Sequence, residues 1–399
     1  MKPDGQNNLR IHPLIILLSL LSLFEALPSR AMTPQDEARI IALKTEGTLL
    51  RLKADYEGVH RISDQLKALF PEHSIGYTIN LNTLVTRLSW DSQQQHYDQI
   101  ILDDAEKTLS LCRAQIKAKP KDYDGYYYCG QAHFALTYLH ALRGNYYRAG
   151  KNGSDTIETL EQTLALNPDL IDAKMHLGVA YYYADNLPPF IKAFSRFLWF
   201  VPTGNSERSL PYIKEVSERG QYFKDVAKFL YSDLLINGND NDREQAINIL
   251  NELITLYPEN RRFQLRYISL LGEVSRFEQS LATANEFIAT EKTYARDAID
   301  IALVRLWATR AYLGLHDIDG AISAFGVIEQ TAANREFPSW GKSWFTLTLA
   351  QIQDLRDQRK DAIANYKKVI KMFADYAGTE VIDAAKHGLD TPFTVSSIN

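Results

Sequence analysis

The sequence has little charge imbalance, few prolines and only two cysteines. Its 399 residues include 44 basic and 49 acidic side chains, which leaves a formal net charge of -5. A nucleic-acid-binding domain needs a concentration of basic side chains, so this balance argues against DNA or RNA as the main partner. The 14 prolines and 20 glycines are too few for a disordered or Gly-rich chain. These absences favour a folded, helical protein.

Long apolar runs are also missing, apart from one near the N-terminus. Lys2 and Arg10 precede an apolar run at residues 14–24, and Ser29 and Ala31 place small residues at the -3 and -1 positions of a cleavage site. The run is too short to span a hydrocarbon core of roughly 30 Å as a helix. We expect a signal peptide at residues 1–31, cut near Ala31, and a periplasmic or secreted mature chain without a transmembrane segment. An uncleaved N-terminal anchor is the alternative.

The sequence contains no recognisable catalytic or metal-binding motif. It has no Gly-x-Ser-x-Gly elbow, no phosphate-binding loop and no Cys/His pair in a catalytic context. His133 and His140 are seven residues apart, whereas metal-binding helices more often use a spacing of four, and no cluster of further ligands accompanies them. The acidic run at residues 237–242 lacks the spaced ligands and final Glu of a calcium loop. We therefore expect no enzymatic activity, no cofactor and no metal.

A 34-residue period is the clearest positive feature. Pro168 and Pro202 are 34 residues apart and enclose Gly178, Tyr181 and a second helical pattern, which resembles the tetratricopeptide (TPR) helix-turn-helix repeat. Similar units follow one another along most of the chain, and two of them begin their second helix with Asp-x-Ala-Ile or Asp-Ala-Ile, at residues 319–322 and 361–363. The resemblance implies an all-α, right-handed superhelical solenoid of about eight TPR-like repeats.

The repeats divide the chain into predicted segments. We expect N-terminal repeats at 32–204, an irregular helical connector at 205–225, C-terminal repeats at 226–375, and a capping helix and tail at 376–399. Polar stretches at 90–100 and 143–154 are longer than a repeat turn requires and predict inserted loops. The connector contains a short helical pattern, and a hinge there is an alternative.

A concave surface lined by the first helix of each repeat is the expected binding site for a protein or peptide. Aromatic residues and Arg are common at interaction hot spots. The spacing predicts that the surface contains Tyr127, Gln131, Phe134, Met175, Val179, Tyr182, Tyr183, Tyr231, Arg262, Arg310 and Trp344. The alternative for each tyrosine is packing between repeats.

The pattern as a whole predicts a non-enzymatic interaction scaffold of the bacterial-type cell envelope. A periplasmic accessory protein that holds a small molecule, a lipid-like compound or a cell-wall fragment in an aromatic groove is the second hypothesis. An insertion at Tyr146 and Tyr147 that closes a pocket would favour this second hypothesis, whereas a long open groove would favour the scaffold.

The two cysteines fall on helices that are expected to be adjacent. Cys112 lies on the second helix of the second repeat, and Cys129 lies on the first helix of the next. In an exported protein such a pair predicts a disulfide, which would stabilise the fold by roughly 3 kcal/mol. Two buried free thiols are the alternative.

Overall fold

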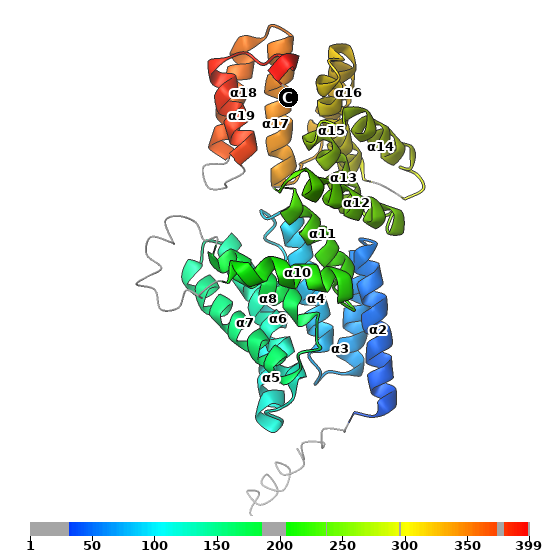
Figure 1. Ribbon diagram of the computed structural model, residues 1–399, viewed down its shortest axis with the longest axis vertical. Coiled ribbons are helices and arrows are strands. Elements are labelled where there is room, and N and C mark those ends of the chain that lie inside the picture. Colours follow the sequence, from blue (N-terminus) through cyan, green and yellow to red (C-terminus); the bar gives the residue numbers. More distant parts are fainter. Residues whose placement is uncertain (1–31, 186–204, 237, 295–296, 373–378, 398–399) are drawn as a thin grey trace, which may run out of the picture. The chain divides into compact units, whose positions relative to one another are not determined.

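The computed structural model describes residues 32–185, 205–236, 238–294, 297–372 and 379–397. The predicted signal peptide and the second helix of the 168–202 repeat, which includes Pro202, lie outside these residues. The described elements are all helical (Figure 1). They are α2 (Pro34–Leu52), α3 (Tyr56–Leu69), α4 (Ile75–Trp90), α5 (Asp98–Ala118), α6 (Tyr123–Leu142), α7 (Tyr146–Leu166), α8 (Ala173–Asp185), α10 (Ser206–Arg219), α11 (Lys224–Leu235), α12 (Asp240–Leu256), α13 (Arg261–Glu273), α14 (Phe277–Ala289), α15 (Ala298–Gly314), α16 (Ile318–Ala332), α17 (Ser339–Leu355), α18 (Arg359–Met372), α19 (Thr379–Asp390) and the short 3-10 helix η1 (Val395–Ser397).

Most helices pack against the next one in the chain. Pairs such as α6 with α7, α15 with α16 and α17 with α18 lie side by side, and each pair also contacts its neighbour (Figure 1). Buried apolar residues such as Leu160, Leu250 and Phe325 fill the spaces between the helices. The predicted all-α fold of stacked helix pairs is therefore confirmed.

Five of the turns inside helix pairs have the same backbone conformation. Two residues before the second helix, one residue adopts a positive φ of 59–71°. The next residue then donates its N–H to a carbonyl five positions earlier, as Asn145 does to His140 at 2.8 Å, which satisfies the end of the first helix. The residues with positive φ are Ala54, Gly144, Ser275, His316 and Asp357.

The prediction of an inserted loop at residues 143–154 is wrong. Only residues 143–145 form a turn, and α7 begins at Tyr146. The extra residues lengthen α6 and α7 to 20 and 21 residues because the helical pattern continues through them. Tyr146 and Tyr147 are 43% and 56% exposed on α7, so they do not form a loop that closes a pocket.

Residues 206–219 form a regular helix, α10, which packs against both α8 and α11. Its residues Ser209 and Ile213 lie against Gly178 of α8, and the Ser209 hydroxyl donates to the Gly178 carbonyl at 2.8 Å. A Cβ at Gly178 would come within 3.2 Å of both Ile213 and the Ser209 carbonyl oxygen, so glycine permits this close approach. The small residue that the repeat pattern places at 178 thus accommodates α10.

Cys112 and Cys129 form a disulfide that joins α5 to α6. Their Cα atoms are 5.6 Å apart, within the range that a disulfide requires, and both side chains are buried. The bond ties two consecutive repeats together.

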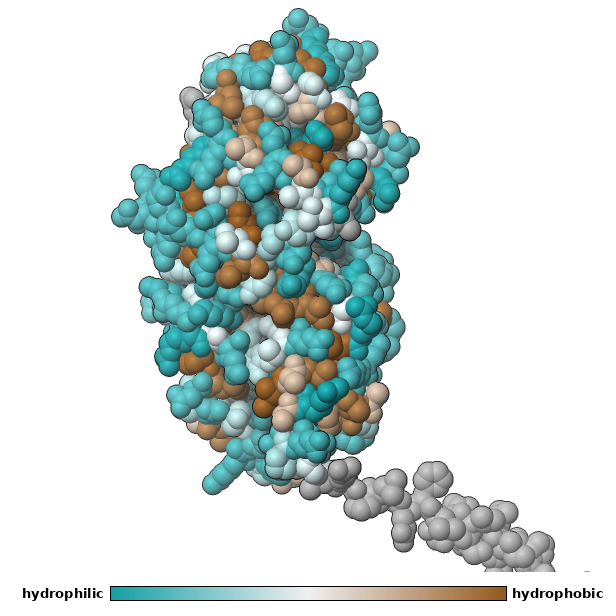
Figure 2. All heavy atoms as spheres, turned by 90° about the vertical axis from the view of Figure 1, so that its right-hand side faces the viewer, coloured by the Kyte–Doolittle hydropathy of each residue, from teal (hydrophilic) through white to brown (hydrophobic). Residues whose placement is uncertain are grey.

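The surface that Figure 2 shows has hydrophobic side chains scattered among hydrophilic ones. Within the described part of the chain, no helix combines the length and the apolar character that crossing a membrane would require.

Candidate functional site

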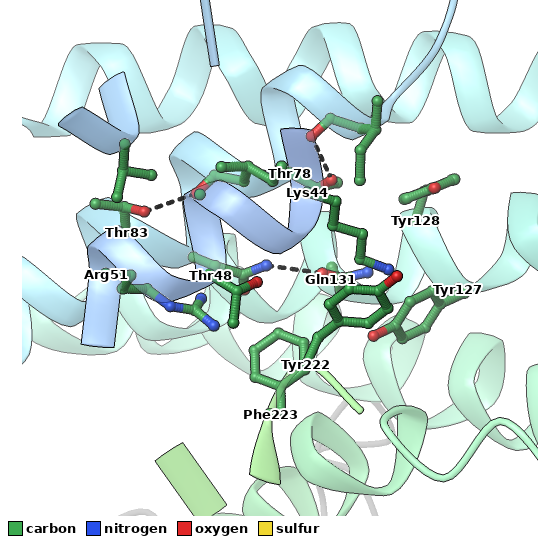
Figure 3. A pocket seen from close by; sticks show the side chains of 15 residues that line it. Lys44, Thr48, Arg51, Thr78, Thr83, Tyr127, Tyr128, Gln131, Tyr222 and Phe223 are labelled. Atoms are coloured by element: carbon green, nitrogen blue, oxygen red, sulfur yellow. Dashed lines mark hydrogen bonds between the residues drawn. The ribbon is translucent and has the colours of Figure 1, made fainter. Parts of the chain in front are cut away.

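The first candidate site is a cavity of about 30 Å³, which we call the N-terminal cavity. Helices α2, α3, α4 and α6 line it together with Tyr222 and Phe223, which precede α11 (Figure 3). Lys44, Thr48 and Arg51 reach it from one face of α2, because positions i, i+4 and i+7 share a helix face. Tyr127, Tyr128 and Gln131 line it from α6.

Two cations lie against aromatic rings in this cavity. The Lys44 amine lies 3.7 Å from the centre of the Tyr222 ring, and the Arg51 guanidinium lies 4.9 Å from the centre of the Phe223 ring (Figure 3). Burial lowers the pKa of Lys44 and lowers the pKa of Arg51 to about 10. Both shifts mean that the protein environment disfavours the charged forms.

Asp172 holds the two aromatic residues in position. Its buried carboxylate accepts backbone N–H groups from Gln221, Tyr222 and Phe223 at 3.0–3.2 Å. The same carboxylate opposes the lowering of the Lys44 and Arg51 pKa values through its charge, but it makes no ion pair within 4.0 Å of either side chain. Its hydrogen bonds therefore fix the segment before α11.

A chain of polar side chains leads from the interior to the cavity. Nε2 of the buried His176 lies 3.0 Å from Oδ1 of Asn82, and Nδ2 of Asn82 donates to Oε1 of Gln131 at 2.7 Å. Burial, and to a lesser extent Arg51, lowers the pKa of His176 to about 3, so this imidazole is neutral. With its oxygen occupied by Asn82, the Gln131 amide retains its NH2 group as a donor.

The second candidate site is larger and lies between α13, α15, α17 and α19. We call it the C-terminal cavity, and its volume is about 510 Å³. Arg310 lies over two indole rings there, 4.4 Å from the centre of Trp344 and 5.6 Å from that of Trp307. Burial lowers the pKa of Arg310 to about 10, although Glu273 and Glu380 oppose this. The cavity thus combines aromatic surface, one cation and an acidic border.

Repeats far apart in the chain also meet. Arg262 of α13 donates to the Thr86 carbonyl at 2.7 Å and to the Ser89 hydroxyl at 2.8 Å. The ring of Trp90, next along α4, lies edge-on to Trp340 with a centroid distance of 5.2 Å. These contacts place the end of α4 against α13 and α17.

The residues predicted from the repeat spacing are distributed over several places. Tyr127 and Gln131 line the N-terminal cavity, whereas Arg310 and Trp344 line the C-terminal cavity. Arg262 contacts α4, as described above. The remaining predicted residues do not line either cavity. Phe134 lies edge-on to His176, and Met175 and Tyr231 are buried in the core. Val179 packs against the core cluster that contains Tyr231, whereas Tyr182 and Tyr183 are 38% and 56% exposed.

Sequence reasoning missed the two cations and the two aromatic residues of the N-terminal cavity. Lys44 and Arg51 share a helix face with Gly47, the small residue of the first repeat, and this spacing was the available signal. Tyr222 and Phe223 lie where the repeat period is interrupted, so no spacing rule places them. Among the described residues, no group of three His, Cys, Asp or Glu side chains is arranged to hold a metal.

Comparisons with known proteins agree with the helix-pair architecture. Residues 227–260, which include most of α11 and α12, match the model of the tetratricopeptide repeat. No curated protein matches the sequence. A chain of the APC/C hetero-tetramer Cut9–Hcn1 has 10% identity and a TM-score of 0.51, and the match covers 85% of this chain and 54% of that chain. This protein thus spans about half of that chain's length.

The matches to two further solved structures span nearly the whole length of the known chains. The thermophilic TPR protein TTC0263 of Thermus thermophilus has 13% identity and a TM-score of 0.36, with 58% of this chain and 98% of that chain covered. Yeast Tom70 has 10% identity and a TM-score of 0.27, with coverage of 91% and 96%. At such identities the likeness to solved structures concerns the fold alone.

Proposed function

We propose that this chain of tetratricopeptide-like helix pairs is a non-enzymatic interaction scaffold of the bacterial-type cell envelope that binds a peptide or protein partner on its concave face. Stacked helix pairs leave the first helices of successive repeats available to a partner. The protein–protein interaction role is the general property of such scaffolds, and the envelope location is the specific part of the proposal.

The observation that most supports partner binding is the arrangement of Arg310 in the C-terminal cavity. Its guanidinium stacks on Trp344 beside a volume of about 510 Å³, and Trp and Arg are the residue types most enriched at binding hot spots. A partner that inserts an apolar or acidic side chain here would contact the indoles and the guanidinium together. Loss of either group should weaken the complex.

The envelope location is supported by two independent features. The N-terminal 31 residues have the charge and apolar pattern of a secretory signal, and the chain forms the Cys112–Cys129 disulfide. Disulfides persist in oxidising compartments and are rare in the cytosol. Export would therefore account for both.

A photo-crosslinking experiment in the native envelope tests the proposal. A benzoylphenylalanine probe at Asp383, on the border of the cavity, should give a discrete adduct of higher mass. The double substitution Arg310→Met and Trp344→Leu should remove most of that adduct while circular dichroism shows a folded protein. The control probe is at Lys386, which is exposed on the same helix outside the cavity lining. Identical adducts from both probe positions would reject the site.

A small-molecule accessory role is the second candidate, because the cavity volume lies within the usual 300–1,000 Å³ of ligand pockets. Native mass spectrometry of the protein purified from the envelope distinguishes the small-molecule role from the scaffold role. A bound species of low mass that is absent from the double variant would favour the small molecule, whereas a polypeptide adduct at Asp383 would favour the scaffold.

A further inference from the structure

Neither of the two cations in the N-terminal cavity forms an ion pair with an acid in the described part of the chain. Among the described residues, no carboxylate oxygen lies within 4.0 Å of the Lys44 or Arg51 nitrogens, and Nε of Arg51 is buried without a hydrogen-bond acceptor. Asp172 and Asp124 are the nearby acids, and Asp172 already accepts four hydrogen bonds from three backbone N–H groups. Removing a charge from water without a partner costs several kcal/mol, so this arrangement is unfavourable when the cavity contains only water.

The lining is rich in hydrogen-bond donors. Tyr222 and Phe223 cover the two cations with ring faces, which present no conventional acceptor oxygen. Gln131 retains its NH2 group as a donor because Asn82 occupies its oxygen. Figure 3 shows Lys44, Gln131 and Tyr127 converging on one region, with the Arg51 guanidinium beside Phe223. A group that accepts hydrogen bonds and has a negative charge would complement this lining.

The size of the cavity restricts the anion. One water requires about 10–15 Å³ of this volume, so 30 Å³ accommodates about two oxygen-sized groups. A carboxylate has two oxygens in one plane, which match the planar donor fork of a guanidinium. A tetrahedral phosphate has four oxygens and requires more room.

We propose that the N-terminal cavity binds one carboxylate group, with Arg51 and Lys44 as its cationic ligands and Gln131 as a hydrogen-bond donor. This inference goes beyond the proposed function, because the site is formed by α2, α3, α4, α6 and the segment before α11 and shares no lining residue with the C-terminal cavity. The carboxylate belongs either to a small free acid or to a polypeptide.

Saturation-transfer NMR on the folded protein tests the site with acetate as the probe, and chloride and phosphate at equal ionic strength serve as competitors. Acetate should give a saturable signal that neither competitor removes. Arg51→Met and Lys44→Met should each weaken acetate binding at least about tenfold, since each removes a charge-assisted hydrogen bond. Arg51→Lys keeps the positive charge but lacks the planar pair of guanidinium donors, so this variant should bind acetate with intermediate strength. It provides a second measurement if Arg51→Met fails to fold.

Lys53→Met is the matched control, because Lys53 lies just after α2 and pairs with Glu259 at 3.4 Å instead of lining the cavity. Its acetate binding should equal that of the wild type.

Competition against acetate by three peptides identifies the source of the carboxylate. The first is a short peptide with a free C-terminal carboxylate, the second is the same peptide with an amidated C-terminus, and the third is an amidated peptide with an internal Asp. Competition that requires a carboxylate on the peptide identifies a polypeptide source, and no competition by any peptide identifies a small acid. Displacement of acetate by chloride, or unchanged binding in Arg51→Met, would overturn the inference. Neither result depends on crosslinking at Asp383.

Discussion

His176 illustrates how a single residue is constrained by its surroundings. Its ring lies between Phe134 and Phe223, with a centroid distance of 4.9 Å to each, and only Nε2 has a polar partner, Asn82. Burial lowers its pKa from 6.5 to about 3, with a smaller contribution from the positive charge of Arg51. The native protein therefore keeps this imidazole neutral at pH values where the unfolded chain protonates it.

The lowered pKa predicts a pH-dependent stability. Below pH 6.5 the unfolded state binds a proton at His176 that the native state does not, so this contribution to stability is present above pH 6.5 and is lost as the pH falls towards 3. Between pH 7 and pH 4.5 the loss should be roughly 3 kcal/mol. His176→Gln, which keeps a donor for Asn82, should lose less stability over the same range. Urea unfolding of both proteins at several pH values measures the difference, and parallel curves would contradict the assignment.

At the scale of the elements, the turns between paired helices depend on backbone conformation. Gly144 has a φ of +71°, and a Cβ at this position would meet no atom within 4 Å. The conformation alone, and not a steric clash with neighbours, therefore favours glycine there. Gly326, inside α16, also has open space around it but an ordinary helical backbone.

These two glycines predict opposite effects of one substitution. Gly144→Ala should lower the free energy of unfolding by about 1 kcal/mol because alanine disfavours a positive φ. Gly326→Ala should raise it by roughly 0.5–1 kcal/mol because alanine favours the helix. Chemical unfolding of both variants measures the effects. Two changes of the same sign would show that the turn at residues 143–145 does not require the left-handed conformation.

At the scale of the whole molecule, the contacts of α4 with α13 and α17 depart from a simple repeat array. In such an array each repeat contacts only its neighbours, and stability is nearly a sum of local terms. Here Arg262 contacts residues more than 170 positions earlier, and Asn260 donates to the Leu52 carbonyl at 2.8 Å across 208 positions. These contacts should couple the unfolding of distant repeats.

Removal of the long-range contact should reduce cooperativity. The double substitution Trp90→Ala and Arg262→Ala should destabilise the protein by about 1–3 kcal/mol and broaden or split its unfolding transition. Arg356→Ala is the control, because Arg356 pairs at 4.0 Å with Glu329 of the adjacent repeat. That variant should keep a single transition. Differential scanning calorimetry distinguishes these outcomes, and a single sharp transition in the double variant would argue against coupling.

The sequence by itself determined the helix pairs, because apolar periodicity and turn residues act within a few positions along the chain. Asp319, for example, which the sequence pattern placed at the start of a second helix, lies in the first turn of α16, and Asp317 caps that helix by accepting the Gly320 N–H. The same local rules misplaced the start of α7, because the polar residues 143–154 can be either loop or exposed helix. Only packing against α6 decides between the two.

The tertiary structure alone decided which polar side chains meet. The contact between Lys44 and Tyr222 and the hydrogen bond between Asn82 and Gln131 depend on how successive helices rotate against one another, a small angle per repeat that accumulates along the array. Spacing rules assigned Tyr127, Gln131, Arg310 and Trp344 to one concave surface, whereas the first two line one cavity and the last two line another. Local patterns also had no means to predict the contact of α4 with α13 and α17, because it joins residues far apart in the chain.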